Sequence, residues 1–450
     1  MKIFFVSLGC DKNLVDSEMM LGQLHKAGYE ITDNENEADA VVVNTCCFIG
    51  DAKVESINTL IEFGEMRKAG SIKALIAAGC LAQRYSDDIR ESIPEVDGIV
   101  GTMSIDEIVP VLDRCLKGER PEFLKPINGD MVYGKDRLIT TGGHYEFLKI
   151  AEGCNKFCTY CVIPQVRGTY RSVPMDVLVS EAKDLAERGV KELILVAQET
   201  TLYGVDLYGE KRLPKLLRAL SEIPGIYTIR VQYMYPEELT DELIEEFKVN
   251  KKLCRYMDIP IQSASDRVLK RMGRKTDRAE ISALIGKLRK ELPDICLRTT
   301  LIAGFPGETR SDFKETCEFV KEARFDRLGV FTYSREEGTP AAAMRGQVPE
   351  FIKKHRRNIL MKLQRDIAYE KAYDDVGRVL TVMVEGAIPD EGAYVCRTYK
   401  DAPGVDGYLF LETDKELMTG DLVEVKVTGA RQYDLTGVIY DESAEQTDNA

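Results

Sequence analysis

The sequence lacks any apolar run long enough to cross a membrane, and it lacks a recognisable secretion signal. Near its start only Ile3 to Val6 form an uninterrupted apolar stretch, and charge returns at Asp11. A signal peptide needs an apolar core of about 7–15 residues, and a spanning helix needs about 18 or more. We therefore expect a protein without a membrane anchor, located in the cytoplasm.

Positive charge is also in short supply. The chain has 61 Lys and Arg against 75 Asp and Glu, so its net charge is -14. Affinity for nucleic-acid backbones depends on basic side chains that neutralise phosphates. This balance disfavours unassisted binding to nucleic acid and favours a basic partner.

Cysteine, in contrast, is plentiful, with 12 in 450 residues. In a small secreted chain that number would suggest disulfides, but a chain of this length without an export signal more often uses cysteine for metal binding or catalysis. The length allows two or three domains with substantial cores. We expect a reducing compartment and a role for several thiols in chemistry.

Residues 1–125 alternate predicted strands with predicted helices, a pattern typical of a parallel α/β sheet. Three of the strands, KIFFVSLG, ADAVVVNT and IKALIAAG, lead into Cys10, Cys46 and Cys80. The intervals between these cysteines match the length of one strand–helix unit, so the three thiols should lie together at the carboxyl edge of one sheet, where these folds bind ligands. Burial alone would explain any one of these three cysteines, but it would not explain why all three follow a strand at the same position. The adjacent Cys47 should point to the other face and be structural.

The rest of the chain divides into three further parts. Residues 140–347 contain six predicted strands separated mostly by helices, which indicates a partial (β/α)6 barrel. Residues 348–376 should form a charged linker helix, and residues 377–442 read as a small antiparallel β-barrel. We expect the last eight residues to be disordered.

The strongest local motif is AEGCNKFCTYCVIP, which places Cys154, Cys158 and Cys161 directly after the first strand of the central block. A 4Fe-4S cluster is usually held by four cysteines, so three would leave one iron open, as catalytic metal sites do. The alternatives are a zinc site and a coincidental structural trio. Zinc commonly takes four ligands, and the three histidines are scattered elsewhere.

This CxxxCxxC spacing on the first strand of a six-unit barrel resembles the radical S-adenosylmethionine (SAM) superfamily. The resemblance implies that the open iron binds SAM and that one electron from the cluster cleaves it to a deoxyadenosyl radical, which attacks a C–H bond. It further implies that Tyr160 packs near the adenine. The other residues expected to contact SAM lie in or after later barrel strands: Gln198, Glu199, Gln262, Arg298 and Thr300.

Over essentially the whole chain, the order of cysteine trio, radical barrel and small β-barrel resembles the methylthiotransferases. That likeness implies a second 4Fe-4S cluster on Cys10, Cys46 and Cys80, a C-terminal OB-like TRAM domain, and an external electron donor such as flavodoxin or ferredoxin. The first trio would present sulfur to the carbon radical that the second generates. No single residue is assigned as catalytic.

The motifs SLGCDKNLVDSE and KIAEGCNKFCTYCVIPQVRGTYRS are most similar to the branch that modifies the β carbon of an aspartate in small-subunit ribosomal protein twelve. The alternative is the branch that modifies an adenosine of tRNA near the anticodon. Residues 378–450 carry six Lys and Arg against fifteen Asp and Glu, a net charge of −9. A domain that grips tRNA should be basic, so a tRNA partner is disfavoured.

Two positions depart from the family pattern. Cys47 stands where glycine is usual, and Ser263 stands where histidine is common, so neither receives a role. A non-enzymatic alternative, an electron carrier with two clusters, is disfavoured because such carriers generally complete each cluster with four cysteines.

Overall fold

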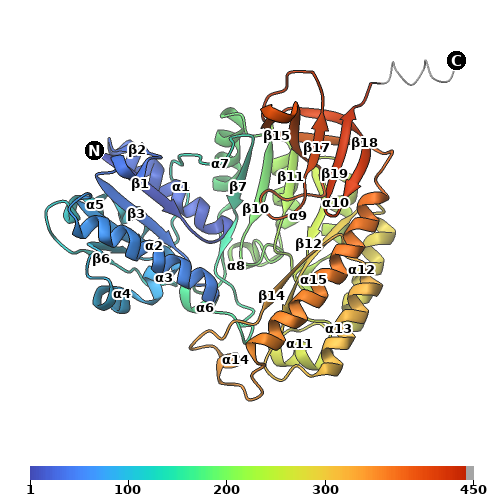
Figure 1. The fold of residues 1–450 in the computed structure, drawn as a ribbon, viewed down its shortest axis with the longest axis horizontal. Coiled ribbons are helices and arrows are strands. Elements are labelled where there is room, and N and C mark those ends of the chain that lie inside the picture. The colour runs from blue at the N-terminus through green and yellow to red at the C-terminus, as the bar shows by residue number, and fades with distance from the viewer. Residues whose placement is uncertain (442–450) are drawn as a thin grey trace.

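A computed structural model describes residues 1–441, and the chain forms three bodies in sequence order (Figure 1). An N-terminal sheet, a central sheet and a C-terminal barrel follow one another from blue to red. Among the described residues, none of the helices combines the length and apolarity that crossing a membrane requires. The expected disorder of the last eight residues, and position 442 of the expected C-terminal domain, lie outside the described range.

The N-terminal sheet has six strands, all parallel, in the order β2-β1-β3-β4-β5-β6. Its central strands β3 and β4 are fully buried, as expected for a parallel sheet covered on both faces. The expected α/β fold is therefore confirmed. The strands are β1 (Lys2–Ser7), β2 (Glu30–Thr32), β3 (Ala40–Thr45), β4 (Ala74–Ala78), β5 (Gly98–Val100) and β6 (Glu122–Phe123). The helices are α1 (Asp11–Lys26), α2 (Gly50–Lys68), α3 (Gly79–Arg84), α4 (Ser86–Ser92) and α5 (Ile108–Cys115).

The central sheet also has six parallel strands, in the order β14-β13-β12-β11-β10-β7, with β7 and β14 at its two edges. This is the expected partial barrel. The strands are β7 (Tyr145–Lys149), β10 (Glu192–Val196), β11 (Thr228–Val231), β12 (Leu253–Asp258), β13 (Cys296–Ala303) and β14 (Arg327–Thr332). The longer helices between them are α7 (Met175–Glu187), α9 (Leu213–Ser221), α10 (Asp241–Val249), α12 (Arg278–Glu291) and α13 (Arg310–Ala323), and the shorter ones are α6 (Ile163–Val166), α8 (Val205–Tyr208), α11 (Asp266–Met272) and α14 (Pro340–Ala343).

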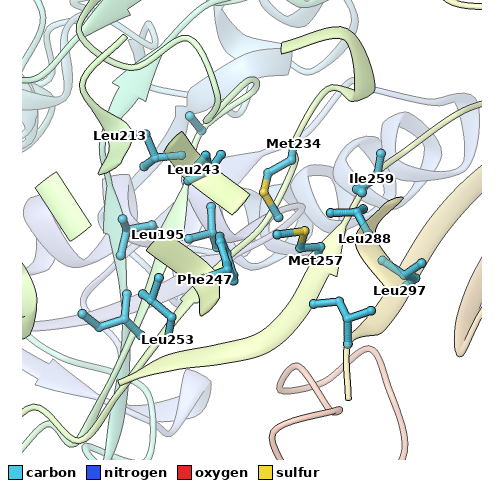
Figure 2. Packing of buried hydrophobic residues seen from close by; sticks show 14 of the residues in the cluster. Leu195, Leu213, Met234, Leu243, Phe247, Leu253, Met257, Ile259, Leu288 and Leu297 are labelled. Carbon is cyan, nitrogen blue, oxygen red and sulfur yellow. The ribbon is translucent and has the colours of Figure 1, made fainter. Parts of the chain in front are cut away.

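Apolar side chains from the strands and the outer helices form one core in this domain (Figure 2). Leu195 of β10 and Met257 of β12 meet Phe247 of α10, and all three are fully buried. Burying side chains of this kind stabilises a fold by about 1.5–3 kcal/mol each. The core holds the strand ends in place and thereby fixes the positions of the residues that follow them.

The first strand of the central block is shorter than the sequence pattern suggests. Strand β7 ends at Lys149, and β8 (Ala151–Glu152) pairs antiparallel with β9 (Arg171–Ser172) in a separate small sheet. The chain then turns at Gly153, where φ is +75° and a Cβ atom would lie 2.1 Å from the Thr169 oxygen. This turn, which requires glycine, sends the following cysteine loop out of the sheet.

Helix α15 (Glu350–Tyr373) is the expected linker, and it leads into a closed five-stranded barrel. Four of the strand pairs are antiparallel as expected, but β17 and β19 are parallel. The reason is geometric, since an odd number of strands cannot alternate in direction all the way around a closed ring. The strands are β15 (Val379–Ile388), β16 (Ala393–Arg397), β17 (Leu409–Glu412), β18 (Leu422–Arg431) and β19 (Asp434–Ile439).

The C-terminal barrel closes the amino end of the central sheet. Its loop 398–406 contacts side chains of the central strands: the Tyr399 backbone oxygen accepts a hydrogen bond of 2.8 Å from Arg230 of β11, and Asp406 accepts one of 2.8 Å from Tyr256 of β12. Asp401 pairs with Arg327 at 2.5 Å. The C-terminal barrel is therefore at the end of the sheet opposite to the cysteine loop that follows β8.

Candidate functional site

The three N-terminal cysteines lie at the carboxyl edge of the first sheet. Cys10 precedes α1, Cys46 directly follows β3, and Cys80 lies in the first turn of α3. The chain passes so close at Gly9 that a Cβ atom there would lie 2.9 Å from the Cys46 sulfur. Burial, together with the neighbouring Cys46 and Cys10 thiols, raises the pKa of Cys80.

Cys47 lies beside this trio. Its side chain is fully buried in an apolar cluster that includes Val43 and Leu81, and Cys80 packs against the same cluster. Burial raises the pKa of the Cys47 thiol to about 12, and the Cys47 thiol in turn contributes to the raised pKa of Cys80.

The second trio occupies the loop after β8. Backbone N–H groups point at two of its sulfurs, from Lys156 to Cys154 at 3.5 Å and from Ile163 to Cys161 at 3.4 Å. Between them Phe157 adopts φ +49°, which is uncommon for a bulky residue, and its ring is exposed. Burial raises the pKa of Cys154 to about 11. N–H donors at sulfur favour the thiolate form that a metal requires.

Within residues 1–441 no group of three or more His, Cys, Asp or Glu side chains is arranged to hold a single metal ion. A zinc ion needs its ligands to converge on one point. In a 4Fe-4S cluster each cysteine binds a different iron, so the thiols stand farther apart. The thiols within each trio are close enough to raise one another's pKa, and all of them are free, which fits the separated ligands of a cluster.

Two of the residues expected to contact SAM follow β10 and carry unsatisfied oxygens. Gln198 donates a hydrogen bond of 2.8 Å to Glu152, while its own oxygen is buried with no partner in the described chain. Glu199 is fully buried; Oε1 accepts from the Thr201 backbone at 2.8 Å, and Oε2 has no hydrogen-bond partner there but lies 3.9 Å from the Lys156 ammonium. Burial raises the pKa of Glu199 to about 7. Buried oxygens left open in this way fit a polar ligand.

The remaining expected SAM contacts are more dispersed. Tyr160 packs edge-on against Phe305, with ring centroids 6.3 Å apart. Gln262 has φ +69°, and its N–H donates to the Thr300 oxygen at 2.8 Å. Arg298 pairs with Asp258, the last residue of β12, at 2.9 Å and with Asp406 of the C-terminal barrel at 3.4 Å. Gln198 and Glu199 thus follow β10 together, a backbone bond joins Gln262 to Thr300, and Arg298 lies between the carboxyl end of β12 and the C-terminal barrel.

One buried arginine lies between the two cysteine trios. Arg167 Nε donates to the Cys80 sulfur at 3.3 Å, and its Nη1 contacts Asp16 and Glu152 at 2.6 and 3.0 Å. The next residue, Gly168, accepts a hydrogen bond of 3.2 Å from the Cys154 backbone N–H. Two adjacent residues, Arg167 and Gly168, therefore contact one member of each trio.

Further contacts join the N-terminal domain to the central domain on both sides of Arg167. On one side the Lys12 ammonium lies 3.5 Å from the centroid of the Tyr233 ring. On the other, the Gly50 N–H donates to Ser334 at 3.0 Å, and Arg84 donates to the Glu337 oxygen at 2.5 Å. Both contacts join the first domain to loops at the carboxyl end of the central sheet.

Sequence reasoning missed the polar residues that join the domains. Asn13, Asp16 and Glu18 of α1 are buried although polar, because this helix packs against the central domain. A signal was available: several polar residues follow the strand-ending Cys10 and alternate with the apolar residues Leu14, Val15, Met19 and Met20 on one helix. Arg167, six residues after the last cysteine of the motif, gave no such signal.

Comparison with known proteins matches each part of the chain. The radical SAM superfamily matches residues 148–320, the TRAM domain matches residues 376–439, and the family described as "Uncharacterized protein family UPF0004" matches residues 2–101. A protein of Lachnoclostridium phytofermentans, named ribosomal protein uS12 methylthiotransferase RimO, is 60% identical over 437 residues, 97% of this chain and 99% of the relative. The chain belongs to the uS12 methylthiotransferase family.

A second member of the uS12 methylthiotransferase family, from Pelotomaculum thermopropionicum, is 50% identical and covers 97% of this chain and 98% of its own length. Among solved structures, the radical SAM methyltransferase TsrM of Kitasatospora setae aligns with a TM-score of 0.55 at 14% identity, over 84% of this chain and 80% of that one. That likeness supports the fold alone. Membership of the radical SAM superfamily implies one 4Fe-4S cluster and SAM as cofactors.

Proposed function

We propose that this chain transfers a methylthio group to the β carbon of an aspartate in uS12, the small-subunit ribosomal protein twelve. Full-length relatives at 60% and 50% identity carry that activity in their names. The observation that carries the proposal is that Arg167 bonds to Cys80 of one trio while the next residue, Gly168, bonds to the Cys154 backbone of the other. Two thiol trios linked through adjacent residues suit a reaction that needs both a radical and a sulfur source.

We assign Cys154, Cys158 and Cys161 to the radical cluster, and Cys10, Cys46 and Cys80 to a second 4Fe-4S cluster. When bound, the first cluster and SAM supply the radical that removes hydrogen from the substrate, and the second cluster supplies the sulfur. The chain's own part is to hold these groups at one gap. Backbone N–H groups at Cys154 and Cys161 stabilise the thiolates that iron requires.

Residues after the barrel strands would hold SAM in this gap. Glu199 Oε2, which lacks a hydrogen-bond partner and lies 3.9 Å from the Lys156 ammonium, is one acceptor for the SAM ammonium, and the unpaired oxygen of Gln198 is a second. Tyr160, against Phe305, offers an aromatic edge for the adenine. Gln262 and Thr300 line the same end of the sheet, whereas the two carboxylates at Arg298 leave it a weaker candidate.

The proposal includes an electron donor such as flavodoxin or ferredoxin, a cytoplasmic setting, and domain limits near residues 1–125, 140–347, 348–376 and 377–442. The acidic C-terminal segment supports a basic protein substrate over tRNA, because a charge of −9 opposes phosphate backbones. No relative reported above is named for tRNA.

The deciding experiment is an anaerobic assay of the reconstituted enzyme with SAM, reductant and either purified uS12 or an unmodified tRNA. We expect the mass of uS12 to rise by one methylthio group in place of one hydrogen, with the change located at an aspartate. The Cys154→Ala variant is the matched control and should leave uS12 unchanged. Modification of tRNA alone would contradict the proposal.

A further inference from the structure

The guanidinium of Arg167 donates hydrogen bonds both to side-chain oxygens and to a cysteine sulfur. It is only 1% exposed, and its three donor-bearing nitrogens point at different partners. Nη1 bonds to Asp16 at 2.6 Å and to Glu152 at 3.0 Å, and Nη2 bonds to Asn13. Nε donates instead to the Cys80 sulfur at 3.3 Å. The bonds to oxygen fix the plane of the guanidinium and so aim its Nε–H at the thiol.

A second buried cation, Lys149, also pairs with the carboxylates that Arg167 contacts. Lys149 pairs with Asp16 and also with Glu152, at 3.1 Å from the latter. Two buried cations thus face two buried carboxylates, and the group is neutral before any charge on Cys80 is counted. The Nε–H of Arg167, which points at the Cys80 sulfur, is therefore the group that stabilises an additional negative charge on that sulfur. The potential of an iron–sulfur cluster depends on hydrogen bonds to its sulfurs and on solvent exposure.

We propose that Arg167 is a positioning residue for the N-terminal cluster: its Nε–H···Sγ bond fixes Cys80 and raises the reduction potential of that cluster above what the three thiolates alone would give. The inference rests on the second cluster of the proposed function. The one-electron-reduced cluster carries one more negative charge than the oxidised one, so a donor at sulfur stabilises the reduced form more.

A second arginine provides a matched control. Arg137 is also buried between the domains, pairing with Glu18 at 2.5 Å, Glu146 at 2.9 Å and Glu181 at 2.8 Å. Its hydrogen-bond partners within the described chain are these carboxylates and the Phe147 oxygen, with no sulfur among them. Loss of Arg137 therefore disturbs domain packing without removing a bond to a cysteine.

The test uses the full chain in which Cys154, Cys158 and Cys161 are replaced by alanine, so that one cluster remains. Anaerobically reconstituted protein is titrated with dithionite, which gives one electron to each cluster, and the reduced fraction is followed by electron paramagnetic resonance. At the midpoint potential of this parent, we expect Arg167→Gln to lower the reduced-to-oxidised ratio at least tenfold, equivalent to 59 mV for one electron. Arg137→Gln should stay within about twofold of the parent, and Arg167→Lys should fall between.

An unchanged ratio in Arg167→Gln, or an equal shift in Arg137→Gln, would overturn the inference. If Arg167→Gln binds no iron, the Arg167→Lys variant decides: a lowered ratio supports the inference, and a ratio equal to that of the parent refutes it. Absence of iron from the parent itself would count against the second cluster, and so against the proposed function rather than against Arg167 alone.

Discussion

Glu192, the first residue of β10, accepts a hydrogen bond of 2.7 Å from Arg397 of the C-terminal barrel. Its other carboxylate oxygen accepts one of 2.9 Å from Arg230. All three side chains are almost completely buried. Breaking a buried pair by removing one partner costs about 3–5 kcal/mol, so Glu192→Gln should lower the free energy of unfolding by that amount in urea denaturation.

The control for this prediction is Glu210→Gln. Glu210 pairs with Lys215 at 2.7 Å at an exposed position, where ion pairs contribute little because water screens them. We expect no measurable change in stability. An equal loss in both variants would show that the charge at Glu192 has no special role in joining the domains.

The lowered pKa of Glu192 predicts how the stability of the fold depends on pH. Burial alone would raise the pKa of Glu192, but Arg397 and Arg230 outweigh it and lower the pKa from 4.5 to about 2. Because the unfolded chain takes up the proton first, this contribution is present above pH 4.5 and is lost as pH falls toward about 2. The stability difference between wild type and Glu192→Gln should therefore shrink over that interval, as measured by denaturation at several pH values.

Gly79→Ala should damage the N-terminal thiol site. Its φ is +87°, and a Cβ atom would lie 2.1 Å from Asn44 Oδ1 and 2.7 Å from the Thr45 oxygen, directly before Cys80. Gly70 is the control, since its φ is +77° but nothing lies within 4 Å. Both substitutions carry the cost of a left-handed residue, about 1–2 kcal/mol. We expect only Gly79→Ala to reduce the iron bound after reconstitution, and equal iron in the two would contradict this reading.

Iron counting on cysteine variants tests the two trios separately. Cys154→Ala and Cys10→Ala should each lose about one cluster's worth of iron and keep the other. Cys317→Ala, which replaces a half-buried thiol on α13, should bind as much iron as wild type. Retention of all iron in Cys10→Ala would argue against a second cluster.

Glu199→Gln should weaken SAM binding while the iron content stays normal. A hydrogen bond to a charged group contributes about 1.5–3 kcal/mol, so we expect SAM affinity to fall at least about tenfold in equilibrium dialysis. Glu187→Gln, at the end of α7, changes an exposed carboxylate and is the control. Unchanged affinity in Glu199→Gln would remove this residue from the SAM site.

Patterns local in the sequence predicted most of the fold. Period and spacing were sufficient for the central sheet and for the three long strands of the N-terminal sheet, but not for the short strands β2, β5 and β6. The position of Cys10, Cys46 and Cys80 after β1, β3 and β4, which are neighbours in the sheet, was enough to place them at one sheet edge. The likeness to known motifs then supplied the chemistry.

Contacts between distant residues could not be predicted in the same way. Arg167 and Asp16 are 151 residues apart, and Glu192 and Arg397 are 205 apart, so no local period relates them. The parallel pair of β17 and β19 follows from ring closure, which strand patterns do not reveal. No local pattern indicated that Arg298 would pair with both Asp258 and Asp406.

The C-terminal barrel plugs the amino end of the central sheet, whereas the cysteines lie beyond the carboxyl end. The acidic barrel therefore attracts a basic protein that binds at the cysteines only over a distance and through solvent. At physiological ionic strength such attraction fades over about 8 Å, so the barrel should speed the encounter with uS12 only at low ionic strength, while the turnover of bound substrate stays unaltered by salt.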